Sequence, residues 1–355
     1  MGRVLHVVVT DAFAGVERYV ANTALELQRR GWNVGVVGGS LSRMSDATAG
    51  AVRCLPGRTP FEALRSIAAF GKCDVCHAHM TFAEATAVMG RPIHRSPVVV
   101  TRHFAARRGS TPIGSLIAPL IGAAVSHEIA ASSFIASRIE RQPDLVLTNG
   151  VPPSRYSWRR ESRVVLVLQR LEPEKDTDTA LRAWERSRLW KDGWSMRIVG
   201  DGSERHRLEA WVAEHRLPSV TFAGWVSNVE DELAGAGMLL ASAPAEPCGL
   251  SVLEAMAAGV PVVACRGGGH LETVGLVPAA PAFRPADADA AARAMRSLLP
   301  DPTRATVSRA MRDAFASGFT LRAHVDRLIE EYEQVLAKRR RRVPAPKGGP
   351  LGRLG

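Results

Sequence analysis

The chain has 355 residues, of which 46% are hydrophobic and 23% are charged. This length fits two domains, and the composition excludes a disordered, collagen-like or fibrous chain. The net charge is +11, but residues 338–355 contain seven Lys or Arg residues and no acidic residue. The remaining residues, 1–337, therefore carry only +4 (11 − 7), and the body of the protein is mildly basic.

The composition of residues 338–355 predicts a disordered basic tail, because the segment is rich in Pro and Gly and poor in apolar residues. Three hypotheses stay open for it: a solvated tail, peripheral contact with an anionic membrane surface, or non-specific contact with nucleic acid. Nucleic acid is not the expected partner, because aromatic residues make up only 6% of the chain and the tail has none.

The chain shows no targeting or membrane-spanning pattern. Its first residues enter a strand-like segment directly, without the apolar core of a signal peptide. The longest apolar stretch, 112–125, contains Pro119 and is too short to span a bilayer. Five cysteines form an odd and sparse set. We therefore expect a cytoplasmic protein with reduced thiols, with peripheral contact at the inner face of the membrane as an open alternative.

Short apolar runs alternate with amphipathic helical stretches, which predicts parallel sheets covered by helices. An amphipathic helix is expected over 16–30, ended by Gly31. The strands expected in this half of the chain are 4–9, 32–37, 51–55, 74–79, 97–101, 123–126 and 144–149.

A turn-rich segment, 149–162, interrupts the alternation and is predicted to be a linker. The alternation then restarts with strands expected at 163–169, 195–200, 219–224, 238–243, 261–265 and 275–279. The prediction is an α/β protein with two Rossmann-like domains facing across a cleft, residues 1–155 and 156–320. A final helix, 321–337, could pack on either domain and so cross to the first. In such folds ligands bind outside the carboxyl ends of the strands, which places the site between the domains.

The segment 245–275 carries the clearest chemical signal. A strand is expected to end near Ala243, Glu246 follows in a loop, and a helix begins near Gly249 with Glu254 in its first two turns. A helix N-terminus with free N–H groups suits a phosphate. The N–H groups expected to point out of this helix end are those of Cys248, Gly249, Leu250 and Ser251.

Two carboxylates beside an anion site need an explanation, because carboxylates repel phosphates. Hydroxyl groups on both sides of a diphosphate supply one, since carboxylates accept hydrogen bonds from hydroxyls. A sugar would lie beyond one end and a ribose beyond the other. The alternative is that Glu246 is a loop charge and Glu254 a surface residue of the helix.

The segment from Glu246 to Glu254 resembles the E-x7-E motif of glycosyltransferase family 4, a family of retaining enzymes with the GT-B fold. The residues after it resemble the family's Gly-rich turn and third Glu, here Glu272. In the same half, the resemblance extends over 165–184, 196–209 and 220–243. In the first half it is weaker and covers 14–20, 74–80, 98–103, 124–133 and 147–152. It covers roughly residues 3–335 and implies a GT-B fold with the donor bound mainly to the second domain.

Three positions depart from the family pattern. The usual Gly-Gly turn is Ala14-Gly15, the usual Phe after Glu-Pro is Cys248, and a frequent Gly before the Arg-Leu turn is Gln169. Backbone contacts should survive these changes, whereas sugar selectivity is left open.

The resemblance also implies roles for single residues. Arg170 and Lys175 match the basic pair that holds the donor diphosphate, and Gly15 lets the first-domain backbone approach the same phosphates. His103 matches the active-site His near the reactive carbon of the sugar. The catalytic set is then His103, Glu246, Arg170 and Lys175. The donor-binding set is Gly15, Arg170, Lys175, Glu246, Cys248, Gly249, Leu250, Ser251 and Glu254.

The function implied is that of a retaining, hexosyltransferase-type glycosyltransferase. It would move a sugar from a nucleotide-diphosphate sugar to an acceptor hydroxyl of a small molecule, glycan or lipid, without metal or other cofactor. Two alternatives stay open: another GT-B sugar-nucleotide enzyme, such as an epimerase, or a basic-tailed protein that binds membranes or nucleic acid.

Several metal-like patterns are interpreted as structural. Cys73, Cys76 and His77 match a haem-attachment pattern formally, and His77 and His79 with the cysteines could bind zinc, but the segment has the pattern of a buried strand. The D-x-D pairs at 176–178 and 287–289 lie at expected helix starts, where Asp caps backbone N–H groups. No metal site is predicted.

Overall fold

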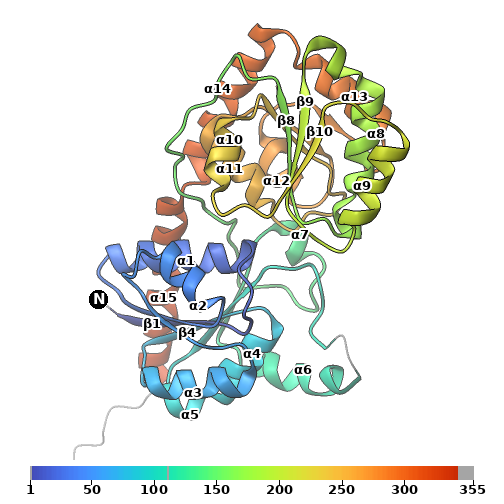
Figure 1. Ribbon diagram of the computed structural model, residues 1–355. Coiled ribbons are helices and arrows are strands. Elements are labelled where there is room, and N and C mark those ends of the chain that lie inside the picture. Colours follow the sequence, from blue (N-terminus) through green and yellow to red (C-terminus); the bar gives the residue numbers. More distant parts are fainter. Residues whose placement is uncertain (1, 110–111, 343–355) are drawn as a thin grey trace, which may run out of the picture.

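The computed structural model describes residues 2–109 and 112–342, which form two α/β domains stacked one on the other (Figure 1). Each domain is built on one parallel sheet, with strand orders β3-β2-β1-β4-β5-β6-β7 and β10-β9-β8-β11-β12-β13. The two Rossmann-like domains expected from the sequence are confirmed. The expected domain boundary at 155/156 falls between the last strand of one sheet and the first strand of the other.

The strands of the first sheet are β1 (Arg3–Val8), β2 (Asn33–Val37), β3 (Arg53–Leu55), β4 (Val75–His79), β5 (Val98–Arg102), β6 (His127–Ala130) and β7 (Leu145–Val146). Its helices are α1 (Gly15–Arg29), α2 (Leu41–Ala47), α3 (Pro60–Phe70), α4 (Thr81–Met89), α5 (Arg91–His94), α6 (Pro112–Ala124) and α7 (Ser133–Ala136). The strand predicted at 123–126 is wrong, because the apolar run before it continues as α6 and the strand starts at His127. A short uncharged apolar run does not distinguish helix from strand.

The strands of the second sheet are β8 (Val164–Leu168), β9 (Ser195–Val199), β10 (Val220–Gly224), β11 (Met238–Ala241), β12 (Val262–Cys265) and β13 (Ala282–Phe283). Its helices are α8 (Thr177–Ser187), α9 (Arg205–Glu214), α10 (Val229–Ala234), α11 (Leu250–Ala258), α12 (His270–Thr273), α13 (Ala288–Ser297) and α14 (Asp301–Gly318), with 3-10 turns η1 (Pro173–Lys175), η2 (Leu189–Asp192) and η3 (Val274–Leu276). The strand predicted at 275–279 is wrong, because η3 lies there and the sheet ends with β13.

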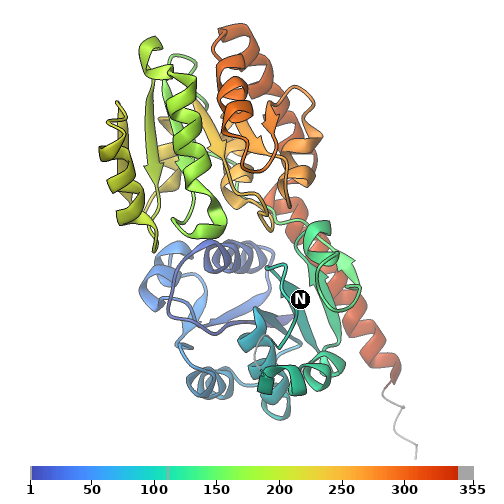
Figure 2. The same cartoon turned by 90° about the vertical axis from the view of Figure 1, so that its right-hand side faces the viewer.

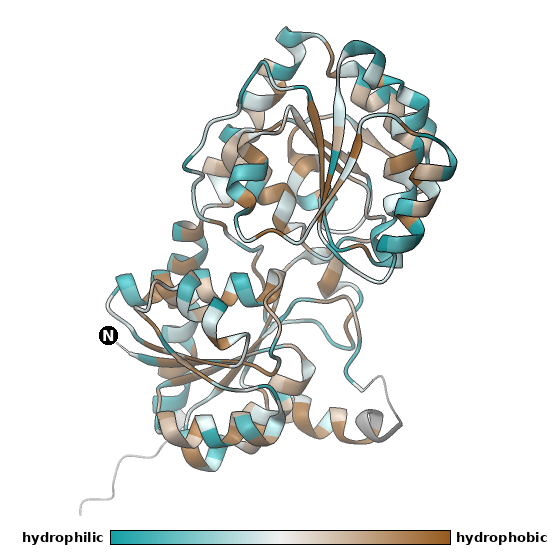
Figure 3. Ribbon diagram, viewed as in Figure 1, coloured by the Kyte–Doolittle hydropathy of each residue, from teal (hydrophilic) through white to brown (hydrophobic). Residues whose placement is uncertain are grey.

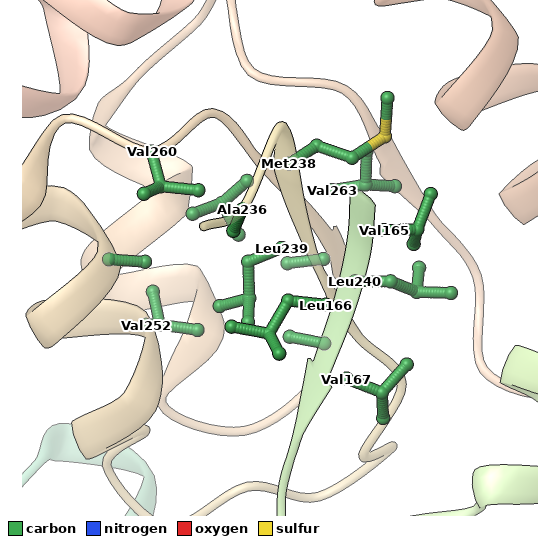
Figure 4. Packing of buried hydrophobic residues seen from close by; sticks show 14 of the residues in the cluster. Val165, Leu166, Val167, Ala236, Met238, Leu239, Leu240, Val252, Val260 and Val263 are labelled. Carbon is green, nitrogen blue, oxygen red and sulfur yellow. The ribbon is translucent and has the colours of Figure 1, made fainter. Parts of the chain in front are cut away.

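The core of the second domain lies between its sheet and its helices. Side chains of β8 and β11, such as Leu166 and Leu239, pack toward Val252 of α11 (Figure 4). This packing fixes α11 against the sheet, and with it the loop that leads from β11 to α11.

The last helix, α15 (Leu321–Arg342), returns from the second domain and packs along the first (Figure 2). Val325, Leu328 and Tyr332 are fully buried in the same hydrophobic cluster as α1 and one face of the first sheet. The final helix therefore crosses to the first domain, one of the two alternatives that the sequence left open.

The predicted start of the basic tail at residue 338 is wrong, because α15 continues to Arg342. Lys and Arg favour helices, and their charge suits the C-terminal end of a helix. Arg339 also donates a hydrogen bond from Nη2 to the carbonyl oxygen of Arg95, at 2.5 Å. Residues 343–355 lie outside the described residues. No helix among those that the structure describes has the length and hydrophobicity needed to cross a bilayer.

A row of histidines lies buried between the first sheet and the helices α1 and α15. His6 of β1 pairs in register with His77 of β4, and His79 lies opposite Thr101 of β5. Both ring nitrogens of His77 form hydrogen bonds. Nδ1 lies 2.6 Å from the Tyr332 hydroxyl, and Nε2 lies 2.8 Å from the Thr101 hydroxyl. The polar face of these strands is therefore closed by α15.

Burial keeps these imidazoles neutral, because charging them in the interior would cost their hydration. Burial lowers the pKa of His6 and of His103 to about 3 and that of His324 to about 4. The pKa values of His77 and His79 fall well below the ordinary value for the same reason, with the neighbouring histidines adding to the effect.

We predict that acid unfolds this protein at a mild pH. The folded pKa values lie below the unfolded value of about 6.5, so the unfolded chain binds more protons and stability falls as pH drops below 6.5. His6, His103 and His324 each cost about 2 kcal/mol between pH 7 and pH 5, or about 6 kcal/mol together, comparable to the whole stability of a domain, and His77 and His79 act in the same direction. The two carboxyls whose pKa burial raises, Glu84 and Glu254, act in the opposite sense but are fewer. Urea unfolding at pH 7, 6 and 5 measures this, and equal midpoints would contradict it.

A second prediction concerns the bond between Tyr332 and His77. Tyr332→Phe leaves a buried ring nitrogen of His77 without its partner, which should lower the free energy of unfolding by about 1–3 kcal/mol. Tyr156→Phe is the matched control, because Tyr156 is exposed on the second domain. Equal urea midpoints for the Tyr332→Phe variant and the wild type would show that α15 does not depend on this bond.

Candidate donor-sugar site between the domains

The two domains meet where α1 and α11 begin. A Cβ atom built on Gly15, the first residue of α1, would lie 3.3 Å from Cδ1 of Leu250, the first residue of α11. Leu250 packs against the hydrophobic clusters of both domains. The amino ends of two helices, one from each domain, therefore converge on one point, and helix amino ends carry partial positive charge.

The start of α11 has the form that the sequence predicts. Gly249 precedes the helix with φ 78°, in the left-handed region that favours glycine. The first helical bonds run from the N–H groups of Val252 and Leu253 to its carbonyl oxygen. In the part of the chain that the structure describes, no acceptor is found for the N–H groups of Cys248, Gly249, Leu250 and Ser251. These four groups are available to an anion.

The Gly-rich turn after β12 positions the loop that carries Glu246. The Gly269 N–H donates to the Glu246 carbonyl oxygen at 2.6 Å. A Cβ atom on Gly268 would lie 2.2 Å from that same oxygen, and one on Gly267 would lie 1.9 Å from the Pro244 carbonyl oxygen. No other residue fits there, so the glycines of this turn are explained by close backbone contact.

Glu246 forms an ion pair with Lys175, with Oε2 2.6 Å from Nζ and both side chains mostly buried. Gln169 holds the backbone of Lys175 in place, because its side-chain amide donates to the Lys175 carbonyl oxygen at 3.0 Å and to the Ser242 hydroxyl at 3.2 Å. The Gln that departs from the family pattern therefore has a positioning role in this chain.

Arg170 does not join the Lys175–Glu246 pair. Its Nη2 lies 2.7 Å from Oε1 of Glu174, and half of its side chain is exposed. To bind a phosphate, the guanidinium must leave Glu174. Cys248 is not a nucleophile here, because burial raises the pKa of its thiol to about 12.

Glu254 reaches across the domain boundary. Its carboxylate lies 3.0 Å from Nη2 of Arg18 on α1. Burial raises the pKa of Glu254, and the charge of Arg18 acts against that rise. A carboxylate that is mostly buried and next to a cation is a strong hydrogen-bond acceptor.

Two further contacts join the domains on the other side of the α11 start. The Ser132 hydroxyl donates to the Pro247 carbonyl oxygen at 2.6 Å. The Glu272 carboxylate accepts from the N–H groups of Ser133 and Phe134, each at 2.7 Å, and so caps α7. The third Glu of the resemblance thus binds the first domain. The sequence gives no signal for its partners.

His103 follows β5 directly and is almost completely buried. Its Nε2 lies 3.0 Å from Nδ1 of His79, whose Nε2 lies 3.0 Å from Nδ1 of His6. Neutral imidazole has one donor and one acceptor, so the tautomers of the three rings are linked. The ring of Tyr19 packs edge-on against His103, with ring centroids 5.0 Å apart. His6 and His79 were not predicted as partners of His103, although histidines on neighbouring predicted strands were a usable signal.

The residues of the metal-like patterns have structural partners in the fold. Ring nitrogens of His6, His77 and His79 lie within 4.8 Å of one another, but both nitrogens of His77 already have hydroxyl partners. Cys76 belongs to the hydrophobic cluster on the opposite face of the sheet. The caps predicted for the D-x-D pairs are confirmed: Asp176 accepts from the Thr179 N–H and Asp287 from the Ala290 N–H.

Comparisons with known proteins agree with this geometry. The family profile described as Glycosyltransferase Family 4 matches residues 13–155, and the one described as Glycosyl transferases group 1 matches residues 153–315. The two matches cover both domains and meet at the predicted linker.

Among individual proteins, a Mycobacterium tuberculosis glycogen synthase is 29% identical over 297 residues, covering 77% of this chain and 71% of its own. A Mycobacterium tuberculosis GDP-mannose-dependent α-(1-6)-phosphatidylinositol monomannoside mannosyltransferase is 32% identical over 210 residues, 52% of each chain. The Anabaena protein HepE, solved in complex with UDP-glucose, shares the fold with a TM-score of 0.78 at 18% identity, over 94% of this chain and all of its own. The chain belongs to glycosyltransferase family 4 and is a nucleotide-sugar glycosyltransferase with the GT-B fold.

Proposed function

We propose that this protein transfers a sugar from a nucleotide-diphosphate sugar to an acceptor hydroxyl with retention of the anomeric configuration. The observation that carries the proposal is the start of α11, where four N–H groups with no acceptor among the described residues lie between Glu246 and Glu254 at the domain boundary. An anion site flanked by two hydroxyl-accepting carboxylates suits a diphosphate that bears a sugar at one end and a ribose at the other.

The positive charge for the leaving diphosphate comes from the chain itself. The α11 N-terminus, Lys175 and Arg170 are the groups assigned to it, and Gly15 lets the backbone of α1 approach. These groups stabilise the charge that develops as the sugar bond breaks. Losing one preorganised group of this kind typically lowers the rate by about 10²–10³.

The two carboxylates have cation partners that a bound donor would share. Glu246 holds Lys175, and Glu254 holds Arg18. In the proposed complex, Glu246 accepts hydrogen bonds from the transferred sugar while Lys175 turns to the phosphate. Glu254 accepts from the ribose and stays beside Arg18, so donor binding strengthens the contact between the domains.

For retention we favour attack from the same face as the leaving group. The acceptor oxygen bonds to the anomeric carbon as the bond to phosphate breaks, and the leaving phosphate oxygen takes the acceptor proton. Glu246 is assigned to sugar hydroxyls, which leaves it unsuited as a nucleophile. His103 contributes a neutral imidazole near the sugar, with its tautomer set by His79 and His6.

The first test separates the two carboxylates. Calorimetry starts from the nucleotide, among UDP, GDP, ADP and dTDP, that raises the melting temperature most. Glu254→Gln should weaken binding of that free nucleotide by about 10–150-fold, the value of a charge-assisted hydrogen bond. Glu246→Gln should spare the free nucleotide and lower turnover, because its bonds strengthen as the sugar takes on positive charge.

Arg18→Gln is the control for this test. It breaks the pair with Glu254 without removing the ribose acceptor, so nucleotide affinity should fall much less than with Glu254→Gln. Equal losses in the two variants would show that Glu254 serves only the contact between the domains. Wild-type turnover in both Glu variants would overturn the proposed function of the motif.

A further prediction concerns metal. Because fixed cations and a helix end supply the positive charge, turnover should persist after dialysis against EDTA. Initial rates before and after dialysis, with the apparent donor KM, measure this. Loss of turnover that Mg²⁺ or Mn²⁺ restores would contradict the metal-free proposal.

A further inference from the structure

Helix α6 is an apolar helix that lies outside the hydrophobic cores. Residues 116–124 read LIAPLIGAA, and Leu116 and Leu120 are more than 70% exposed. None of these described residues belongs to a hydrophobic cluster of the protein. Figure 3 shows α6 as a mostly brown helix on the far side of the first domain from the second. An exposed row of large apolar side chains like Leu116, Ile117 and Leu120 is unusual for a free surface.

Two neighbouring helices extend this apolar surface. Met89 at the end of α4 is 66% exposed, and Ile93 of α5 is partly exposed. The Arg91 side chain ties α5 to α6, because its Nη2 donates to the Ala124 carbonyl oxygen at 2.5 Å. We call the set Met89, Ile93, Leu116, Ile117 and Leu120 the α6 surface.

Cations border the α6 surface. Of the five arginines in residues 85–127, Arg102 and Arg108 are buried and paired with Glu84, Glu128 and Glu140, whereas Arg95 and Arg107 are exposed. The bond from Arg339 to the Arg95 carbonyl oxygen brings the end of α15 to the end of α5. Residues 338–342 are all Lys or Arg, and the last acidic residue of α15 is Glu333. The exposed Arg95 and the basic end of α15 therefore lie beside α5, at the Ile93 end of the α6 surface, and α6 itself lies at the other end (Figure 1).

We infer that the α6 surface binds an anionic lipid bilayer. Leu116, Leu120 and Ile117 would enter the interface between headgroups and acyl chains. Residues 116–124 have no charged side chain, so their insertion would not require burying a charge. The cations beside α5 would face lipid phosphates, and each would add to the affinity through electrostatic attraction. The sequence assigned peripheral membrane contact to the basic tail, whereas this inference assigns it to a folded surface of the first domain.

This inference does not depend on the proposed glycosyl transfer, because binding to vesicles involves no turnover. The test is sedimentation of the full-length protein with vesicles of phosphatidylcholine alone or with about 40% phosphatidylglycerol. We expect binding to the anionic vesicles, weak binding to neutral ones, and a decrease in binding with added salt.

Two variants test the apolar part, Leu116→Ser/Leu120→Ser and Met89→Ser/Ile93→Ser. Each should weaken binding to anionic vesicles at least about tenfold, because two apolar side chains lose their insertion. The matched control is Leu271→Ser/Leu276→Ser, two exposed leucines of the second domain. Circular dichroism and melting temperature confirm folding of each variant. For the charged part, Arg340→Gln/Arg341→Gln should weaken binding severalfold, and Arg293→Gln/Arg309→Gln should not.

Three outcomes would overturn the inference. The first is no binding of the wild type to anionic vesicles. The second is binding that both Ser variants of the α6 surface retain, which would leave only the basic end of the chain. The third is a wild-type dimer in light scattering that Leu116→Ser/Leu120→Ser converts to a monomer without any vesicle binding, which would assign the surface to a second copy of the chain.

Discussion

The convergence of the α1 and α11 amino ends is the arrangement on which the rest of the site depends. A Cβ atom on Gly15 would lie 3.3 Å from Cδ1 of Leu250, so a larger residue at position 15 would have to displace the Leu250 side chain. Partial positive charges that face each other repel, and a nucleotide diphosphate bound between them would offset this. The ion pair of Glu254 with Arg18 holds the two helices together across the boundary.

The domains are joined by two chain segments that lie side by side. The first leads from β7 to β8, and the second from α14 to α15. They bond to each other, because the Val151 N–H donates to the Phe319 carbonyl oxygen at 3.0 Å and the Leu321 N–H to the Val151 carbonyl oxygen at 2.8 Å. Gly150 allows this approach, since a Cβ atom there would lie 2.6 Å from the Thr320 carbonyl oxygen. The crossing of α15 thus ties the helix that covers the histidine row to the junction of the two domains.

How much the sequence could predict depends on how local each feature is. The start of α11, the Gly-rich turn and Glu246 lie within about 30 residues of chain, and their order alone indicated the anion site. The partners of Glu254 and Glu272 belong to the other domain, and no local pattern marks them. Predictions were wrong where the local pattern is ambiguous. The uncharged run before β6 could have been helix or strand. The basic end of α15 has the composition of a disordered tail, but helix propensity and the contact with Arg95 favour helix.

The buried histidines could have been grouped from the sequence by comparing neighbouring parallel strands. His6, His77, His79 and His103 lie on three neighbouring strands or just after them, on one face of the sheet. Their burial excludes charge, so the row is neutral where the adjoining domain supplies its cations from Lys175 and the α11 end. Because the row is neutral, the positive electrostatic potential at the domain boundary comes from those fixed groups. A protonated His103 would compete for the diphosphate and draw it away from the α11 end. Burial therefore excludes a proton from His103, and in the proposed complex this leaves the diphosphate to the helix amino ends and to Lys175.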